Sequence, residues 1–333
     1  MKKFTGVEDV DDIHALLSEA KKIKSESLRK NSPGKNKTLG LIFLNPSLRT
    51  RMSTQKAAMN LGMNVMVINA GQDSWSWEFE DGAVMNGNKT EHIKDAAAVI
   101  SQYCDIAAIR CFPSLTNQQE DYNETLLNQF IKYCKVPVIS LESATLHPLQ
   151  SFADLITINE NWKSTTKPKV VLTWAPHIKP LPQAVANSFS EWMCRAEMDF
   201  TITHPQGYQL HEKFTQGAKI CHHQDEALLN ADFVYVKSWS SYHDYGLMPA
   251  YHEKLWTLNA EKMKLTNHAK IMHCLPVRRN VELCDELLDG ENSLVLQQAA
   301  NRVYAAQTIL QQMLENSVLH KNVHDEKIAA IHY

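Results

Sequence analysis

The 333-residue sequence lacks the local patterns that mark several large classes of protein. It contains no G-x-G-x-x-G, no G-K-[ST] and no H-E-x-x-H, so the usual signals of dinucleotide, nucleotide and zinc sites are missing. No apolar run approaches the roughly 20 residues that span a membrane. The first residues, Met1-Lys2-Lys3-Phe4, lead into acidic sequence without the apolar core of a secretion signal. We therefore expect a cytoplasmic protein without a membrane partner.

Paired cysteines and excess charge are also missing. The seven cysteines are odd in number and scattered, with no C-x-x-C pair, which favours reduced thiols over disulfides. Net charge is −3, and this balance excludes a general electrostatic attraction to nucleic acid or to an anionic membrane. Hydrophobic content of 44% and charged content of 21% are typical of a soluble globular protein. The length suggests two domains.

The most informative stretch runs from Phe43 to Arg51, with the sequence Phe-Leu-Asn-Pro-Ser-Leu-Arg-Thr-Arg. An apolar run of strand length precedes it, and a helical pattern ending at Gly62 follows. Ser47 is therefore the expected helix cap, with Arg49 and Thr50 in the first turn. A helix N-terminus with two arginines and two hydroxyls suits an anion such as phosphate. A capped surface helix with solvated arginines is the alternative at this point.

Strand-like runs alternate with helix-like stretches along both halves of the chain. This alternation predicts an α/β protein with two domains, each a parallel sheet flanked by helices, and an active site in the cleft between them. We place the first domain at residues 1–145 plus 300–333 and the second at residues 155–298. The expected strands are Thr38–Leu44, Asn64–Ile68, Asp105–Arg110, Val136–Leu141, Lys169–Trp174, Asp199–Thr203, Ala218–Cys221, Asp232–Val236, Ala269–His273 and Ser293–Leu296. A last helix is expected from Ala299 to Glu315, followed by a frayed tail.

Polar residues follow many of these strands directly, at the edge where open parallel sheets bind ligands. Besides the Ser47–Arg51 run, they are Arg110, His147, Gln150, His177, Lys237, Cys274 and Arg278. Each also has a simpler interpretation. Arg110 can extend to solvent, His147 and Gln150 can be a helix cap and a surface residue, and Cys274 can be an inert buried thiol.

A second strong pattern is His273-Cys274-Leu275-Pro276-Val277-Arg278-Arg279-Asn280. Proline fixes a turn directly after a strand, so the carbonyls of Cys274 and Leu275 are free to point into the cleft. Such carbonyls would accept hydrogen bonds from an amide NH2. Trp75 and Trp77 lie in a polar loop, which fits either an interface or loop packing.

Taken together, the Ser-x-Arg-Thr-Arg, His-Pro-x-Gln and His-Cys-Leu-Pro motifs resemble those of the carbamoyltransferase family, in its order and at about its spacing. The resemblance extends to about residue 316. Trp-Ala-Pro-His at 174–177 and the paired arginines at 278–279 are similar to the branch that acts on N-acylornithine. The Ser-Met-Gly pattern of plain ornithine enzymes is missing, and the aspartate enzyme is the poorer match.

The resemblance implies two sets of site residues. Carbamoyl phosphate would be held by Ser47, Leu48, Arg49, Thr50, Trp75, Arg110, His147, Gln150, Cys274, Leu275 and Arg302. The acylornithine would contact Glu142, His177, Lys237, Arg278 and Thr90. Trp75 and the Thr90 loop would come from a neighbouring subunit, since the family forms homotrimers.

The chemistry implied is transfer of the carbamoyl group to a neutral δ-amine. Charge developing on the carbonyl oxygen would meet Thr50, Arg110 and His147, and Cys274 completes the residues expected at the reacting group. The departing phosphate can take the amine proton, so no metal or organic cofactor is implied. The product would be an acylcitrulline, a step toward arginine.

The acyl group is inferred from the residue that matches Thr90. Acetyl-preferring relatives carry an acidic residue there, which would repel the free carboxylate of a succinyl group. Thr90 is neutral, so N-succinylornithine is favoured over N-acetylornithine, with plain ornithine as a further alternative. Glu282 is another position at which this sequence differs from the acetyl-preferring relatives, because some of them have lysine there. The rival of a different class is a non-catalytic metabolite-binding protein of the same fold.

Overall fold

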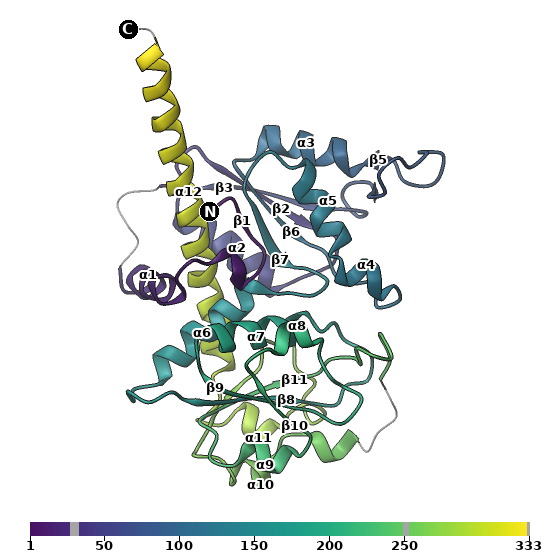
Figure 1. The fold of residues 1–333 in the computed structure, drawn as a ribbon, viewed down its shortest axis with the longest axis vertical. Helices are drawn as coiled ribbons and strands as arrows, with labels where there is room; N and C mark the ends of the chain where they lie inside the picture. The colour runs from purple at the N-terminus through teal and green to yellow at the C-terminus, as the bar shows by residue number, and fades with distance from the viewer. Residues whose placement is uncertain (27–32, 249–252, 332–333) are drawn as a thin grey trace.

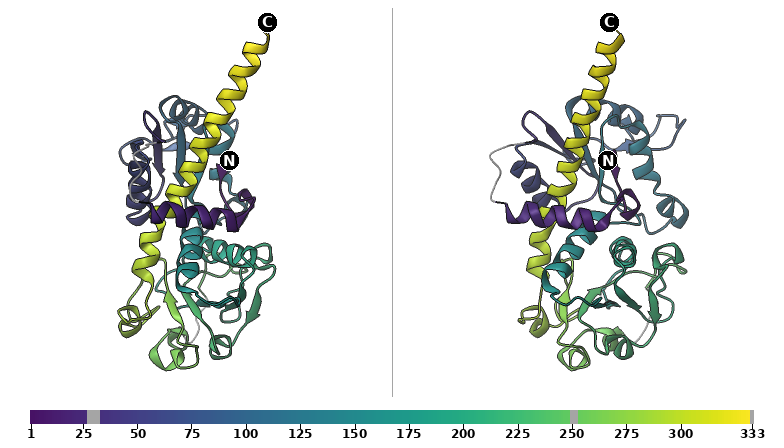
Figure 2. Two further views of the ribbon diagram at one scale, coloured as in Figure 1. Left: turned by 90° about the vertical axis from the view of Figure 1, so that its left-hand side faces the viewer. Right: turned by 60° about the vertical axis from the view of Figure 1, so that its left-hand side comes forward.

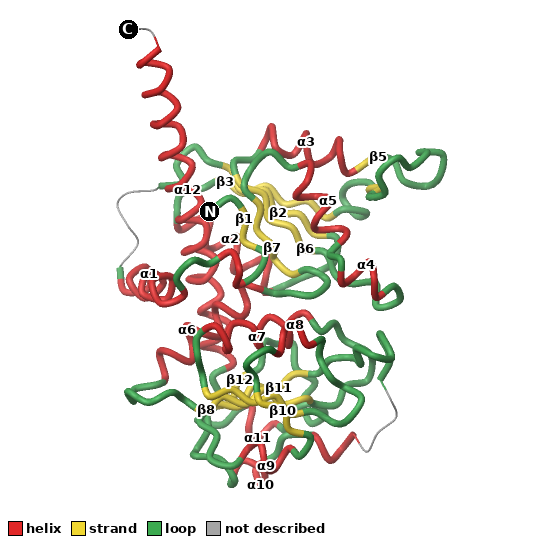
Figure 3. The backbone as a smooth tube through the Cα atoms, viewed as in Figure 1, coloured by secondary structure: helices red, strands yellow, loops and turns green. Residues whose placement is uncertain are grey.

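A computed structural model of the chain describes residues 1–26, 33–248 and 253–331. It contains two α/β domains stacked along the long axis of the molecule (Figure 1). Each domain has a central five-stranded sheet with helices packed around it, as the secondary-structure view makes plain (Figure 3). This is the fold class predicted from the alternation of strand and helix patterns.

The first sheet has the order β1-β7-β6-β2-β3, and all its strand pairs are parallel. From β2 the chain proceeds to β3 on one side and then to β6 on the other, so the strand order reverses between β2 and β6. The carboxyl ends at this reversal point are Phe43 and Arg110, which are register partners. The strands are β1 (Lys3–Phe4), β2 (Thr38–Phe43), β3 (Asn64–Asn69), β6 (Ile106–Arg110) and β7 (Val138–Glu142).

The second sheet has the order β10-β9-β8-β11-β12 and is also parallel throughout. Its order reverses between β8 and β11, whose carboxyl ends are the register partners Trp174 and Lys237. Ligands of open α/β sheets bind at such reversal points, and here two of them belong to one molecule. The strands are β8 (Lys169–Trp174), β9 (Asp199–Thr203), β10 (Lys219–Cys221), β11 (Phe233–Lys237) and β12 (Lys270–Met272).

The helices cover both faces of the sheets. They are α1 (Ile13–Ser25), α2 (Arg49–Asn60), α3 (Ile93–Tyr103), α4 (Gln118–Tyr122), α5 (Thr125–Tyr133), α6 (Pro148–Asn161), α7 (Ala184–Arg195), α8 (Glu212–Thr215), α9 (Gln224–Leu228), α10 (Ala260–Met263), α11 (Asp285–Leu288) and α12 (Val295–Ile331). Two single 3₁₀ turns are η1 (Val7–Asp9) and η2 (Glu253–Trp256), and β4 (Trp77–Glu78) pairs with β5 (Glu91–His92) in a small separate ribbon.

Two helices connect the domains. Helix α6 follows the last strand of the first sheet and is buried along most of its length. Helix α12 begins beside the second sheet, packs against α6, α2 and α1, and continues past the first domain (Figure 2). The buried residues of α2 are all small or short, among them Ala57 and Ala58, which suits the close packing of this helix in the interior.

Several element predictions are wrong. Residues 293–296 form no strand; Ser293 makes only an isolated bridge to Ile271, and α12 begins at Val295. The last helix therefore starts earlier than predicted and extends beyond Ser317 to Ile331, where a frayed tail was expected. Strand β1 was not predicted, because two residues are too few to show a periodicity.

The predicted helix cap at Ser47 is also wrong. Leu48 is the N-cap of α2, in helical backbone conformation, and no side chain caps the helix. The first N–H groups of α2 are therefore not satisfied by Ser47. The predicted end is confirmed, because Gly62 adopts a positive φ of 78° directly after the helix and its N–H bonds to the Met59 carbonyl.

Within the described ranges, no helix is both long and apolar enough to cross a membrane. All seven cysteines are free thiols.

Candidate active site

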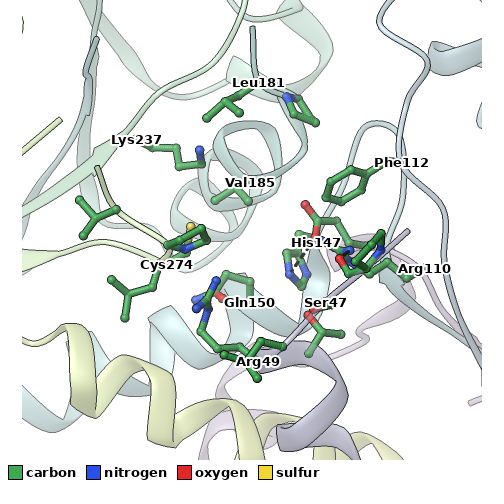
Figure 4. A pocket seen from close by; sticks show the side chains of 18 of the residues that line it. Ser47, Arg49, Arg110, Phe112, His147, Gln150, Leu181, Val185, Lys237 and Cys274 are labelled. Carbon is green, nitrogen blue, oxygen red and sulfur yellow. Dashed lines mark hydrogen bonds and ion pairs between the residues drawn. The ribbon is translucent and has the colours of Figure 1, made fainter. Parts of the chain in front are cut away.

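One cavity of about 570 Å³ lies between the two domains, where the reversal points of both sheets face each other. Figure 4 shows side chains from both domains pointing into it. All predicted site residues except Trp75 and Thr90 line this cavity: Ser47, Leu48, Arg49, Thr50, Arg110, Glu142, His147, Gln150, His177, Lys237, Cys274, Leu275, Arg278 and Arg302. Residues far apart in the sequence thus meet in one place.

The N-terminus of α2 forms one wall. Thr50 is buried, and its hydroxyl accepts a hydrogen bond from Arg302 Nη2 at 2.6 Å. Arg302, on α12, also donates through Nη1 to the side-chain carbonyl of Gln150 on α6. Arg49 lines the cavity in the same turn of α2. Free N–H groups of a helix N-terminus and two guanidinium groups therefore converge, an arrangement that binds phosphate well.

Arg110 and Glu142 form a buried ion pair beside this wall. Arg110 donates to Glu142 Oε2 through Nε at 3.3 Å and through Nη2 at 3.1 Å. Its Nη1 donates to the carbonyls of Asn45 and Pro46, in the loop that leads into α2. Arg110 is therefore fixed by partners on both sides instead of extending into solvent, which was the simpler interpretation of its sequence position.

His147 completes this group. Its Nε2 lies 3.5 Å from Glu142 Oε2, and its Nδ1 is buried with no hydrogen-bond partner among the described residues. Burial, with the nearby charges of Arg302 and Arg110, holds the pKa of His147 well below its usual value. The imidazole is therefore neutral at pH 7, and one ring nitrogen remains available to a ligand.

The turn after β12 forms the opposite wall. Leu275 has a positive φ of 54° and is followed by a cis peptide to Pro276. The N–H of Leu275 donates to His273 Nδ1 at 2.9 Å, and His273 Nε2 lies 3.4 Å from Glu282 Oε1. Cys274 and Leu275 follow the last residue of β12, so their carbonyls lie beyond the strand pairing, as predicted.

Glu282 anchors this turn. Its Oε2 accepts a hydrogen bond from the backbone N–H of Arg278 at 2.7 Å. Burial alone would raise the pKa of Glu282, but hydrogen bonds from His273 and from the Arg278 N–H, together with the charge of Lys237, hold that pKa below its usual value. Burial lowers the pKa of His273, so a neutral His273 donates to an ionised Glu282. The position that was noted as a departure from acetyl relatives therefore has a structural role in this chain.

The far end of the cavity carries the residues predicted for the second substrate. Arg278 Nε donates to His177 Nε2 at 3.1 Å, and His177 Nδ1 donates to the carbonyl of Lys179 at 2.8 Å. Burial lowers the pKa of His177, consistent with this neutral form. Lys237 is buried at the end of β11 and donates to the carbonyl of Ser238 at 2.9 Å.

Trp75 and Thr90 do not reach the cavity of their own chain. Both are exposed in the segment that links β3 to α3, and the Trp75 indole N–H donates to Glu91 at 2.5 Å. Their predicted part in a site would therefore need a second copy of the chain.

Sequence reasoning missed several cavity residues. Phe112, Lys179, Leu181, Pro182, Val185 and Val277 also line the cavity. Lys179 follows His177 by two residues, so its place beside a predicted site residue was a usable signal. The apolar residues gave none, because an apolar residue after a strand looks the same in a core and in a pocket.

Among the described residues, histidine, cysteine and acidic side chains form no group of three or more that could hold a metal ion.

Comparison with protein families decides the relationship of the chain. Residues 2–160 match the model for the carbamoyl-P binding domain of aspartate/ornithine carbamoyltransferases, and residues 182–313 match the Asp/Orn binding domain of the same enzymes. This chain belongs to the aspartate/ornithine carbamoyltransferase family. It is an enzyme that transfers a carbamoyl group, and the resemblance drawn from its motifs is confirmed.

Similar carbamoyltransferases cover nearly the whole chain. The N-succinylornithine carbamoyltransferase of Bacteroides fragilis (strain 638R) is 49% identical over 95% of this chain and 99% of its own length. That of Bacteroides thetaiotaomicron is 50% identical with the same coverage. The N-acetylornithine carbamoyltransferase of Xylella fastidiosa (strain Temecula1) is 35% identical over 93% of this chain and 98% of its own.

Solved carbamoyltransferase structures have the same fold. A mutant of N-acetyl-L-ornithine transcarbamylase complexed with carbamyl phosphate and N-succinyl-L-norvaline has a TM-score of 0.89 and 34% identity, covering 94% of this chain and 100% of that one. Acetylornithine transcarbamylase complexed with acetylcitrulline has the same TM-score and identity, covering 94% of this chain and 99% of that one.

Proposed function

We propose that this protein transfers the carbamoyl group of carbamoyl phosphate to the δ-amine of N2-succinyl-L-ornithine, giving N2-succinyl-L-citrulline and phosphate. The observation that carries the proposal is the charge of the cavity. Six cationic side chains line it, and Glu142 is the one carboxylate among its lining residues. The cations are Arg49, Arg110, Lys179, Lys237, Arg278 and Arg302.

This charge is distributed to suit two anionic substrates. Arg49, Arg302 and the N-terminus of α2 would bind the phosphate group, with Ser47, Leu48 and Thr50 contributing from the same helix end. Gln150 holds Arg302 in place. Lys179, Lys237 and Arg278 lie at the other end, where succinylornithine would bring two carboxylates and acetylornithine only one. Three cations at this end complement the two carboxylates of succinylornithine better than the single carboxylate of acetylornithine.

The reaction follows from this placement. The neutral δ-amine attacks the carbamoyl carbon, a C–N bond forms, and the carbonyl oxygen gains negative charge that Thr50, Arg110 and His147 stabilise. The C–O bond to phosphate then breaks, and the phosphate takes the amine proton as it leaves. The carbonyls of Cys274 and Leu275 would accept hydrogen bonds from the carbamoyl NH2 and so orient the carbon for attack. Glu142 and His177 would contact the acceptor.

Sequence similarity supports the succinyl group. The N-succinylornithine enzymes share 49–50% identity with this chain, against 35% for the N-acetylornithine enzyme. Thr90 adds no negative charge to repel a second carboxylate. N-acetylornithine and ornithine are the competing acceptors, and the role in arginine synthesis and a cytoplasmic location belong to the same proposal.

An assay of citrulline formation with the three amines in parallel tests this proposal. We expect turnover with N-succinylornithine at a kcat/KM at least about tenfold above that with N-acetylornithine, a difference of about 1.4 kcal/mol. A higher kcat/KM with N-acetylornithine or ornithine would show that the proposed acceptor, N-succinylornithine, is wrong. Binding of carbamoyl phosphate without turnover of any amine would favour the non-catalytic alternative.

We further propose a homotrimer in which each subunit supplies Trp75 and its Thr90 loop to the site of a neighbour. The exposed position of both residues outside their own cavity supports this. Mixing inactive Arg49→Ala and Trp75→Ala subunits should restore about a quarter of wild-type activity, because random exchange leaves that share of sites with both residues intact. No recovery after exchange would contradict the shared site.

The domain division at residues 1–145 plus 300–333 and residues 155–298 remains a proposal as well. The strand composition of the two sheets supports it. The start of α12 at Val295 indicates that this helix belongs to neither domain alone.

A further inference from the structure

Asp154 is a fully buried carboxylate that lies outside the cavity and outside the predicted site. It lies on α6, one turn after Gln150. Its Oδ1 accepts a hydrogen bond from Gln150 Nε2 at 2.7 Å and another from Gln298 Nε2 at 2.6 Å. No positively charged side chain forms an ion pair with it among the described residues. An ionisable group in such a place is costly for stability, which suggests that it serves the site.

The first amide connects Asp154 to the phosphate end of the cavity. Because the NH2 group of Gln150 points to Asp154, its carbonyl oxygen points the other way and accepts from Arg302. Arg302 in turn donates to Thr50 on α2. If the Gln150 amide were rotated by half a turn, its NH2 group would face the Arg302 guanidinium. Both groups are donors, so Arg302 would lose this hydrogen bond.

The second amide connects Asp154 to the opposite wall. Gln298 gives its NH2 group to Asp154, and its carbonyl oxygen accepts from the backbone N–H of His273 at 3.0 Å. His273 begins the turn whose next two residues are Cys274 and Leu275. One carboxylate oxygen therefore sets the orientation of both amides, one for each domain's wall of the cavity.

We propose that Asp154 is a positioning residue for carbamoyl phosphate, which orients Gln150 and Gln298 so that Arg302 and the Cys274–Leu275 turn face the same ligand. This rests on the proposed function, because it assumes that carbamoyl phosphate binds between these two walls. Asp154 itself touches no substrate and takes no part in proton transfer.

The surroundings of Asp154 agree with this role. Burial raises its pKa to about 7, opposed by the hydrogen bonds from Gln150 and Gln298. Tyr235 on β11 and Cys274 are the other titratable groups near it, and Arg302 is the nearby cation that favours its ionised form. A carbonyl-type oxygen at Oδ1 accepts both amides whether or not the group carries a proton on Oδ2. Orientation, rather than charge, is therefore the property to test.

The experiment compares Asp154→Ala with Asp154→Asn in the full-length enzyme. Alanine removes the acceptor for both amides, and asparagine keeps a carbonyl oxygen in the same place. We expect Asp154→Ala to raise the Kd and KM for carbamoyl phosphate by about tenfold or more, since two buried hydrogen bonds are lost. Asp154→Asn should stay within about threefold of wild type. The KM for the amine, measured at saturating carbamoyl phosphate, should change less in both.

Glu191→Gln is the matched control. Glu191 on α7 is another carboxylate whose pKa burial raises to about 7, but its contact is with the backbone N–H of Val7, away from the cavity. Its replacement should leave the KM for carbamoyl phosphate unchanged. A purely structural effect of removing the Asp154 carboxylate would change stability or the amount of active enzyme without this selective change in KM.

Gln298→Leu tests the second connection if Asp154→Ala does not fold. It removes only the amide between Asp154 and His273, and should raise the KM for carbamoyl phosphate severalfold. An unchanged KM in folded Asp154→Ala, or in Gln298→Leu, would overturn the proposal, as would Asp154→Asn behaving like Asp154→Ala. Wild-type enzyme that does not bind carbamoyl phosphate would contradict the proposed function as well. Wild type that binds it, with an Asp154→Ala variant that binds equally well, would contradict only the role of Asp154.

Discussion

Arg110 and Glu142 are direct register partners at the carboxyl ends of β6 and β7. Ile109 pairs with Ser140, so an unbroken register would place Arg110 opposite Leu141; a register shift between Ile109 and Arg110 brings Glu142 there instead. Irregularities of this kind re-aim side chains near functional sites. Here the shift lets two charged side chains meet over the cavity, with Nη2 and Oε2 3.1 Å apart.

Replacing Arg110 with lysine should lower kcat by about 10²–10³. Lysine keeps the charge but cannot reproduce the planar donors that Arg110 directs to Glu142, Asn45 and Pro46. Steady-state kinetics and a thermal unfolding curve of the same preparation separate this loss from unfolding. Activity within about threefold of wild type would contradict the oxyanion role of Arg110.

Arg49→Ala should abolish detectable binding of carbamoyl phosphate while the fold stays intact, because it removes a ligand contact and not core volume. Arg51→Ala is the matched control from the same turn. Arg51 bonds to Asn69, lies over the Phe43 ring, and does not line the cavity. Calorimetric titration with carbamoyl phosphate should distinguish the two variants, and equal affinities would show that the phosphate site is elsewhere.

Thr90→Glu should shift the preference from succinylornithine toward acetylornithine. The new carboxylate would repel the succinyl carboxylate and leave the acetyl group unaffected. Thr90→Gln adds the same bulk without charge and serves as the control. The measurement is the ratio of the two kcat/KM values, which should fall by about tenfold or more for the glutamate variant only. An unchanged ratio would remove Thr90 as a determinant of specificity.

Cys274→Ala should retain activity within about tenfold of wild type. Burial raises the pKa of the Cys274 thiol, so it is protonated at pH 7–8 and a poor nucleophile. The backbone carbonyl, which alanine preserves, is the group expected to contact the ligand. A loss of activity of about 10³ or more in a folded variant would instead indicate that the sulfur takes part in catalysis.

Glu191→Gln should stabilise the protein, and the gain should grow with pH. The usual pKa of this carboxyl is 4.5, and in the folded protein it is about 7. Between these values the unfolded chain has lost the proton that the folded protein keeps, so wild-type stability falls as pH rises through this window. Glutamine does not titrate. Its advantage should therefore approach about 3 kcal/mol well above pH 7 and vanish near pH 4. Urea unfolding at pH 5 and pH 8 measures it, and a gain that is equal at both values would contradict this account.

Most of the fold could be predicted from the sequence, because the strands that build the two sheets are apolar runs followed directly by polar residues. Prediction from the sequence was wrong where an element is too short to show a pattern, or where one pattern is compatible with two structures. Strand β1 has two residues, and 293–296 has the composition of a strand but leads directly into α12. Ser47 has the residue type of a cap, but the backbone makes Leu48 the cap. Asp154 and Gln298 left no signal at all, since a polar residue on a helix gives no indication of which residues from other elements lie beside it.

The sequence by itself determined which chemistry this protein contains. Its three motifs specify the cationic and polar groups, because those residue types at those spacings follow the strand ends directly. Only the tertiary structure decided how these groups act together. The two reversal points face one cavity, a register shift pairs Arg110 with Glu142, and buried amides set the direction of Arg302 and of the turn at Cys274. Those relationships depend on contacts between residues far apart in the sequence, such as Thr50 and Arg302, which are 252 positions apart, and no local pattern records such contacts.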